Sequence, residues 1–191
     1  DVVRLIDRAK SDSSVKGIYI KCGNNSNGFG SSEDIRNALL HFKESKKFIY
    51  AYSDVITQGA YYVANVADKI YCHPKGGVDW RGYSMNYFFM KGTLEKLGIE
   101  PQIFYAGKFK SATEPFRETK MTDANRLQST EILNDLYGHF LQLTSDSRKI
   151  DTATLHRYAN ENKIQTAASA VQFGLVDGLK YDDEVKDEIK G

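Results

Sequence analysis

The sequence predicts an α/β fold built on parallel strands. Short β-rich runs alternate with segments whose apolar residues recur at helical spacing, and this alternation implies parallel strands joined by right-handed crossovers. The chain has 191 residues, of which 41% are hydrophobic, which is enough for one ordinary domain with a sizeable core. We therefore expect a single domain over residues 1–191.

The first elements follow from apolar spacing and turn residues. A helix is predicted from Val2 to Ala9 and a strand from Val15 to Cys22, after which the polar run 23–28 breaks the chain. Ser31 or Ser32 can cap the next helix. The apolar face of that helix carries Ile35, Ala38, Leu39 and Phe42.

The middle of the chain repeats the pattern. Residues 48–52 form a β-rich run, residues 59–66 a small-residue helix and residues 69–72 another strand. A helix over 83–97 and a strand over 101–105 are predicted next. The latter strand would deliver the following residues to the carboxyl edge of the sheet, where α/β folds usually hold their sites.

The last third is predicted to be mainly helical. A long helix starts at Met121–Asp123, further helical segments span 151–162 and 167–173, and a closing segment covers Gly174–Gly178. The long helix bears an apolar stripe that predicts a core or subunit-packing face: Ile132, Leu133, Leu136, Tyr137, Phe140 and Leu143.

Composition excludes several classes of function. Charged residues make up 27% of the chain and the net charge is +1, so nothing favours nucleic acid or an acidic membrane surface as a partner. No apolar run approaches the roughly 18–20 residues of a spanning helix. Cys22 and Cys72 lack a CxxC partner and are expected to be buried free thiols.

The four histidines, His41, His73, His139 and His156, are scattered without metal-binding or triad spacing. We therefore expect neither a metal nor a cofactor.

Lys110 is the residue best suited to chemistry. It lies in Gly107–Phe116, among small, apolar and aromatic neighbours. A lysine acts as a general base only when its amine is neutral, and burial in an apolar site can lower a lysine pKa from about 10.4 by roughly 3–5 units. The alternative interpretation is a surface lysine beside a turn.

Four segments together point to a known family. They are Thr57–Ala64, Ala67–Tyr71, Gly76–Asp79 and Gly107–Phe116, and in this order they resemble signal peptide peptidases of the SppA type, also called protease IV. The resemblance is to the amino-terminal half of the long, two-halved form. It implies a ClpP/crotonase-type superhelix of repeated β-β-α units, and it implies that Lys110 is the general base of a Ser/Lys dyad.

One residue departs from the family pattern. The catalytic half of these enzymes has a serine, followed by glycine and an aromatic pair, where this chain has Gln58. The chain therefore resembles the lysine-bearing half alone, and the serine is expected in a carboxyl-terminal half. The start at Asp1–Ile6, mid-helix and without an initiator methionine, gives the same expectation of a longer parent polypeptide.

The resemblance also implies partners and a location. The expected partners are the carboxyl-terminal half of the same polypeptide, further copies in a homo-oligomer, and peptide substrates such as cleaved signal peptides. An anchor outside these residues would hold the enzyme at the bacterial inner membrane, with the catalytic domain on the periplasmic or extracytoplasmic side.

Other residues remain open. Gly28 or Gly30 can offer backbone N–H groups to a substrate or oxyanion, although a plain turn explains this loop equally. Ser111 would point away from Lys110 in an extended segment, whereas Ser53 and Ser84 stay open as nucleophiles.

Glu114 and Trp80 also bear on whether this chain holds a complete catalytic site. Glu114 can tune the lysine or be solvated surface. Trp80 and Arg81 place bulk where, by the resemblance, the serine half has small hydroxyl residues, so this half is expected to lack a complete site of its own.

Two other functions remain alternatives. A non-catalytic scaffold or substrate-binding half would assemble without needing Lys110. A crotonase-type acyl-CoA enzyme would share the fold class, but neither a CoA-binding oxyanion pair nor a catalytic glutamate motif is evident.

Overall fold

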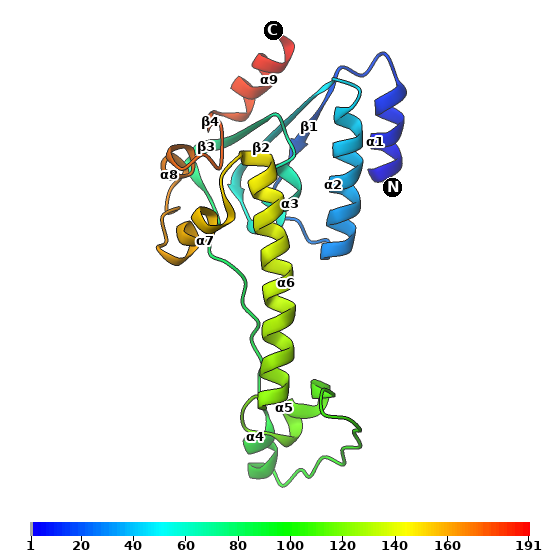
Figure 1. Cartoon of the computed structure of the whole chain (residues 1–191), viewed down its shortest axis with the longest axis vertical. Coiled ribbons are helices and arrows are strands. Elements are labelled where there is room, and N and C mark those ends of the chain that lie inside the picture. The colour runs from blue at the N-terminus through cyan, green and yellow to red at the C-terminus, as the bar shows by residue number, and fades with distance from the viewer. Residues whose placement is uncertain (1) are drawn as a thin grey trace. The chain divides into compact units, whose positions relative to one another are not determined.

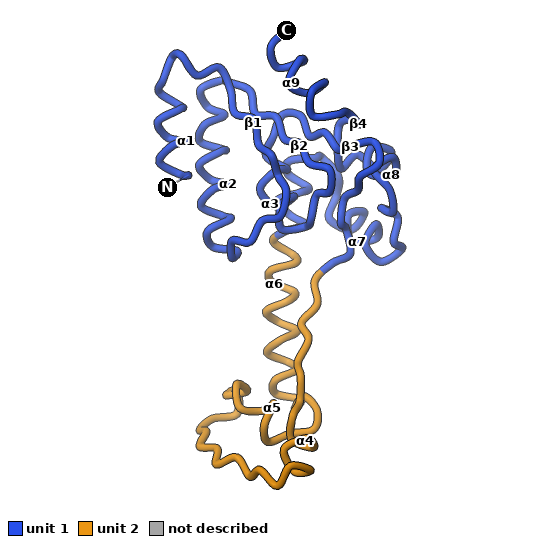
Figure 2. Tube along the Cα trace, turned by 180° about the vertical axis from the view of Figure 1, so that it is seen from behind, with its two compact units in different colours: residues 1–82, 140–191 blue, residues 83–139 orange. Residues whose placement is uncertain are grey.

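The chain folds as two compact units. A computed structural model describes residues 2–191, and Asp1 lies outside the described residues. Unit 1 combines residues 1–82 with 140–191, and unit 2 comprises residues 83–139 (Figure 2). The sequence alone did not indicate this division.

Unit 1 is built on a four-stranded parallel sheet in the order β1-β2-β3-β4 (Figure 1). The strands are β1 (Gly17–Lys21), β2 (Phe48–Ile56), β3 (Lys69–Val78) and β4 (Gly178–Leu179). Ala51 of β2 is level with Ile20 on one side and with Ile70 on the other. The predicted α/β class with parallel strands is confirmed.

Six helices lie wholly in unit 1: α1 (Val2–Ser11), α2 (Phe29–Lys43), α3 (Gln58–Ala64), α7 (Thr152–Asn160), α8 (Ala167–Gln172) and α9 (Asp182–Lys190). The predicted serine cap of α2 is wrong, because Gly28 is the N-cap and both serines lie inside the helix. The amide groups of α7 and α8 are capped by Asp151 and Thr166. Neither α9 nor β4 was predicted.

The two faces of the sheet differ in chemistry. Side chains alternate along β2, so Ile49 and Ala51 share one face and are fully buried. Tyr50 and Tyr52 share the other face, where Tyr52 packs with Tyr71 against α9. The tyrosine face is therefore an amphipathic surface on which α9, the carboxyl-terminal helix, packs.

Cys22 and Cys72 are both buried and free, as predicted. Burial raises the pKa of Cys22 to about 12 and that of Cys72 to about 11. Both thiols are therefore protonated and unreactive at neutral pH.

Unit 2 contains little regular structure apart from a long helix. Its elements are α4 (Lys91–Lys96), the 3-10 helix η1 (Ser111–Thr113), α5 (Glu114–Arg117) and the first part of α6 (Asp123–Arg148). The predicted start of the long helix is confirmed. The rest of α6 belongs to unit 1, where Phe140 is fully buried.

The predicted helix over 83–97 is mostly wrong, since only residues 91–96 are helical. The preceding residues instead follow α6: Tyr83 packs on Tyr137, and the Tyr87 hydroxyl lies 3.0 Å from Ser129 Oγ. These contacts favour an extended segment over a helix.

The predicted strand over 101–105 is also wrong. Strands need a neighbour, and residues 100–106 form no backbone–backbone hydrogen bond anywhere in the described chain. The β-rich composition is present but a pairing partner is not.

The interior of unit 2 is polar. Glu114, Asn125 and Ser129 are its only buried residues among those described, whereas ten of the sixteen exposed large hydrophobic residues of the described chain belong to it. Unit 2 therefore has no buried apolar core of its own.

Candidate functional site

Lys110 lies at a turn on the surface of unit 2. It is the N-cap of η1, and its backbone N–H donates to the Gly107 carbonyl at 3.3 Å. Gly107 has φ +99°, a conformation that favours glycine and closes this turn. The Lys110 side chain is exposed, so the burial that would make it a base is not provided within the chain.

An apolar depression of about 490 Å³ adjoins the lysine. Phe104, Tyr105 and Phe109 line it together with Lys110. Phe104 is 93% exposed, an unusual state for so large an apolar side chain. The surroundings of Lys110 are therefore apolar in composition but open to water.

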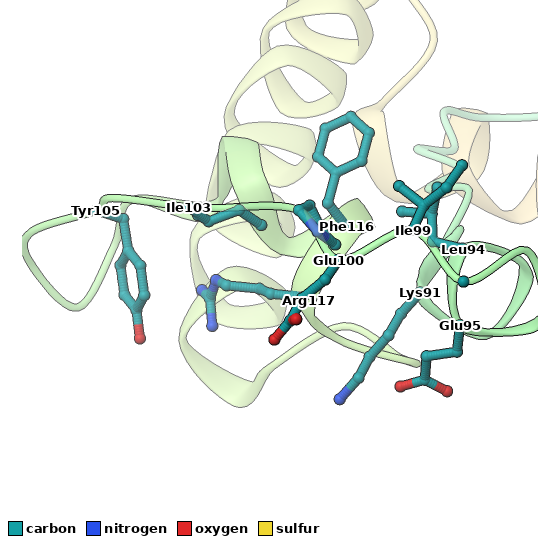
Figure 3. Close-up of a pocket in the computed structure, with 11 residues that line it drawn as sticks. Lys91, Leu94, Glu95, Ile99, Glu100, Ile103, Tyr105, Phe116 and Arg117 are labelled. Carbon is teal, nitrogen blue, oxygen red and sulfur yellow. The ribbon is translucent and has the colours of Figure 1, made fainter.

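A second groove, of about 680 Å³, shares Tyr105 with the first (Figure 3). Leu94, Ile99 and Phe116 provide its apolar lining. Arg117 extends toward Tyr105, with its guanidinium carbon 4.0 Å from the ring centroid. This cation–π contact holds the aromatic ring at the junction of the two hollows.

Glu114 is buried, which corrects the expectation that it is solvated surface. Only 2% of it is exposed, and its carboxylate accepts hydrogen bonds from Thr122 Oγ1 at 2.5 Å and Asn125 Nδ2 at 2.8 Å. Burial alone raises the pKa of this carboxyl, but those hydrogen bonds outweigh it, so the pKa of Glu114 lies below its usual value. The group is a buried carboxylate four residues after Lys110.

Gln58 lies in the corner of unit 1 where β2 ends and α3 begins. It is the first residue of α3, directly after the carboxyl end of β2, where Thr57 caps the helix. Its Oε1 accepts from the backbone N–H groups of Arg81 and Gly82, and its Nε2 donates to the Gly82 carbonyl at 3.1 Å. The amide thus clamps the segment that follows β3.

The loop at the carboxyl end of β1 meets the same corner. Asn25 Nδ2 donates to the Gly59 carbonyl and to Ser32 Oγ, each at 2.9 Å. Gly28 and Gly30 start α2 with open space around them. The structure explains this loop as a helix start, and an oxyanion role for either glycine stays a prediction.

The side chains of Ser53 and Trp80 each donate a hydrogen bond to a backbone carbonyl. The Ser53 hydroxyl donates to the Val55 carbonyl at 2.8 Å. Trp80, only 1% exposed, packs against Phe140 and donates from Nε1 to the Leu155 carbonyl at 3.0 Å. A buried indole therefore directly precedes Arg81 and Gly82, the two residues that Gln58 binds.

Ser84 and Ser111 belong to unit 2. Ser84 is exposed, and Ser111 begins η1 instead of continuing an extended segment, so the strand-based argument about its direction does not apply.

Neither metal chemistry nor a membrane span is indicated by the described residues. They contain no cluster of three or more histidine, cysteine or acidic side chains that could hold a metal ion. None of the helices found in residues 2–191 is both long and apolar enough to cross a bilayer.

Lys110 and Gln58 stand out in the sequence, but the hydrogen bonds around them do not. The buried network of Glu114 gave no sequence signal beyond a glutamate preceding Pro115. The clamp of Gln58 on residues 81–82 joins segments more than twenty positions apart. Such pairings appear only once the fold is known.

Unit 1 is thus a parallel α/β unit with a loop-lined corner at its carboxyl edge, and unit 2 carries a lysine among exposed aromatic side chains. Residues 41–191 match Peptidase family S49, and the chain belongs to this family of serine proteases.

Curated relatives agree with that assignment. The chain is similar to "Protease 4" of Haemophilus influenzae, with 34% identity over 78% of this chain and 25% of that protein. It is 33% identical to "Protease 4" of Salmonella typhi over 81% of this chain and 25% of the relative. "Serine protease SPPA, chloroplastic" of Arabidopsis thaliana is 28% identical over 93% of the chain and 26% of its own length. The chain thus spans about a quarter of the length of these relatives.

Proposed function

We propose that this chain is the amino-terminal, lysine-bearing half of a long-form signal peptide peptidase, and that Lys110 is the general base of its Ser/Lys dyad. The observation that carries the proposal is the clamped side chain of Gln58, which stands where the resemblance implies the serine of the catalytic half. The nucleophile must then come from another half, and Lys110 is the lysine in the matching segment.

The chemistry follows from the two groups. The neutral Lys110 amine takes the proton of the partner serine as its oxygen attacks the peptide carbonyl. The tetrahedral intermediate collapses to an acyl-enzyme, and the leaving amine receives the proton. Water, deprotonated by the same amine, then hydrolyses the ester and releases the serine.

The exposed state of Lys110 supports a role completed by a partner. A lysine works as a base after it loses its proton, and covering it with an apolar surface disfavours the charged form. Phe104, Tyr105 and Phe109 already provide one wall of such a surface. The carboxyl-terminal half, from the same or a neighbouring copy, would provide the other.

The composition of unit 2 supports the same assembly. Exposed apolar residues gather on a unit whose buried side chains are polar, which is typical of a surface meant to be covered. The unpaired backbone of residues 100–106 fits a strand that forms only against a neighbour. We infer a homo-oligomer of the ClpP/crotonase-type fold that family membership implies.

We infer that the substrates are cleaved signal peptides and other unfolded apolar segments, because the grooves beside Lys110 are lined by aromatic and aliphatic side chains. The resemblance to signal peptide peptidases implies a location at the bacterial inner membrane. The anchor and the periplasmic or extracytoplasmic orientation would come from outside these residues.

Lys110→Ala tests the proposal directly. Cleavage of a fluorogenic apolar peptide is measured for the full-length enzyme and for this chain alone, each with and without the substitution. We expect activity only in the full-length enzyme and its loss, by at least about 10³-fold, in the variant. Lys120→Ala, another lysine of unit 2, is the control. Substantial activity after Lys110→Ala would remove Lys110 from the mechanism.

A scaffold half is the second candidate, because the described chain neither buries Lys110 nor holds a nucleophile in the Gln58 corner. It predicts an assembled, active enzyme that is indifferent to Lys110→Ala, so the same experiment separates the two functions.

A further inference from the structure

The turn that carries Lys110 has little to hold it in place. The residues of η1 are not fully buried, and Phe109 beside the lysine is nearly half exposed. On the amino-terminal side, the contact from Lys110 N–H to the Gly107 carbonyl closes the turn locally. An anchor to the rest of unit 2 must come from the carboxyl-terminal side.

Glu114 is the first buried residue after Lys110 and provides that anchor. Besides Thr122 Oγ1 and Asn125 Nδ2, its carboxylate accepts from the Thr122 backbone N–H at 3.3 Å, and Arg117 approaches it to 3.6 Å. Thr122 Oγ1 in turn accepts from Asn125 N–H at 3.2 Å. The carboxylate therefore binds to the first turn of α6, where the helix dipole favours negative charge.

The network continues through the buried interior of the unit. Ser129 Oγ donates to Asn125 Oδ1 at 3.2 Å, and Ser129 Oγ lies 3.0 Å from the Tyr87 hydroxyl. The chain of hydrogen bonds thus joins the Lys110 turn, the long helix and the segment before α4. Three members of this network, Glu114, Asn125 and Ser129, are the buried residues of unit 2 among those described.

A buried carboxylate destabilises the folded protein unless its charge is compensated. Removing one from water costs several kcal/mol unless hydrogen bonds compensate it, and here most of the compensation comes from neutral donors. A single helical turn, η1 into α5, separates Glu114 from Lys110. The anchor is thus short enough to fix the lysine backbone.

We propose that Glu114 is a positioning residue for Lys110, holding the turn that presents the amine to the nucleophile. This inference rests on the proposed function, because it requires Lys110 to be the base. Glu114 touches no reacting atom; it acts through the backbone of residues 110–113 and through α6.

Glu114→Gln in the full-length enzyme tests the inference. The amide keeps the size of the side chain but removes its charge and replaces one of the two acceptor oxygens with a donor, which weakens the bonds to Thr122 and Asn125. We expect kcat to fall by roughly 10- to 100-fold, as for a catalytic group displaced by about 1 Å, with KM changed less than about twofold. Glu131→Gln, on the exposed face of α6, is the matched control.

The pH profile separates positioning from a general structural loss or an electrostatic effect. A misplaced base lowers the plateau of kcat at every pH at which the amine is neutral, while the midpoint of the profile stays in place. A midpoint shift with an unchanged plateau would overturn the inference. A fall no larger than that of Glu131→Gln would do so as well.

A milder variant covers the case in which Glu114→Gln does not fold. Thr122→Val removes the hydroxyl that bonds to Glu114 and keeps the shape of the side chain. It should lower kcat by about 3- to 10-fold in an enzyme that elutes and melts like the parent. Unchanged kcat would again overturn the positioning role.

A failure of this inference can be distinguished from a failure of the proposed function. If Lys110→Ala leaves activity intact, the proposed function fails. If Lys110→Ala abolishes activity and both network variants match the control, only the positioning of Lys110 by Glu114 fails.

Discussion

At the scale of single residues, Gln58 shows how one side chain can hold the segment that follows β3. The glutamine keeps the position after β2 but directs its amide to the backbone of residues 81–82. Three backbone groups depend on this one side chain. We therefore expect it to matter for stability and not for turnover.

Gln58→Leu should lower the free energy of unfolding by about 2 kcal/mol, because it leaves the N–H groups of Arg81 and Gly82 without their acceptor. Urea titration followed by circular dichroism measures the change. Gln172→Leu, on an exposed position of α8, should stay within about 0.5 kcal/mol of the parent. Equal effects of the two substitutions would show that the clamp contributes nothing.

At the same scale, the sequence was informative about chemistry and silent about environment. Lys110 and Gln58 could be identified from their segments, because residue type and order carry that information. The burial of Glu114 could not, because it depends on Thr122 and Asn125 folding back over it. The exposure of Lys110 agrees with the alternative of a surface lysine beside a turn, which composition could not separate from burial because it does not reveal whether a partner is present.

At the scale of elements, predictions held where local pattern and tertiary contacts agree. Strands β1 to β3 have neighbours on the sheet, and their β-rich composition was sufficient. Residues 101–105 have similar composition but no neighbour, so the strand does not form. Helix α9 was missed because its sequence is highly charged, and the contacts that dock it come from tyrosines on the distant strands.

The docking of α9 depends on two carboxylates. Asp182 accepts hydrogen bonds from Lys186, Tyr19 and Lys21, and Glu188 from Lys180, Tyr71 and Tyr50; Val185 is buried between them. Hydrogen bonds, first from Lys186 and then from Tyr19, hold the pKa of Asp182 well below its usual value. Those from Lys180 and the tyrosines likewise lower the pKa of Glu188.

The lowered pKa values of Asp182 and Glu188 fix the sign of the pH dependence of stability. A carboxyl whose pKa is depressed in the folded protein adds stability above its unfolded pKa, about 4 for both residue types, and that stability is lost as the pH falls further. The parent should therefore lose stability as the solution is acidified below about pH 4. The midpoint of urea unfolding at descending pH measures this.

Asp182→Asn combined with Glu188→Gln should flatten the acid dependence and lower the midpoint at neutral pH. Asp187→Asn, an exposed position on the same helix, is the control and should follow the parent. If the double variant loses stability in acid in parallel with the parent, other carboxyls are responsible.

At the scale of the whole molecule, the two units differ in what they bury. Unit 1 encloses an apolar core around Ile49, Phe42 and Trp80, as a stable domain does. Unit 2 encloses polar groups and exposes Phe104, Phe88 and Leu97. Association would bury these apolar side chains, which is why the lysine of unit 2 is proposed to work only in an assembly.

Phe104→Ser tests that view. Because Phe104 is almost fully exposed in the single chain, its loss should leave the melting temperature of the isolated chain unchanged. Burying a phenylalanine at an interface contributes about 2 kcal/mol, so self-association of the full-length enzyme should weaken by about 30-fold. Sedimentation velocity over a concentration series measures the dissociation constant.

Val55→Ser, an exposed apolar position of unit 1, should leave the constant within about threefold, within the usual range for surface substitutions. If Phe104→Ser behaves like Val55→Ser, this part of unit 2 faces solvent in the assembled enzyme, and the surface that covers Lys110 must be sought elsewhere.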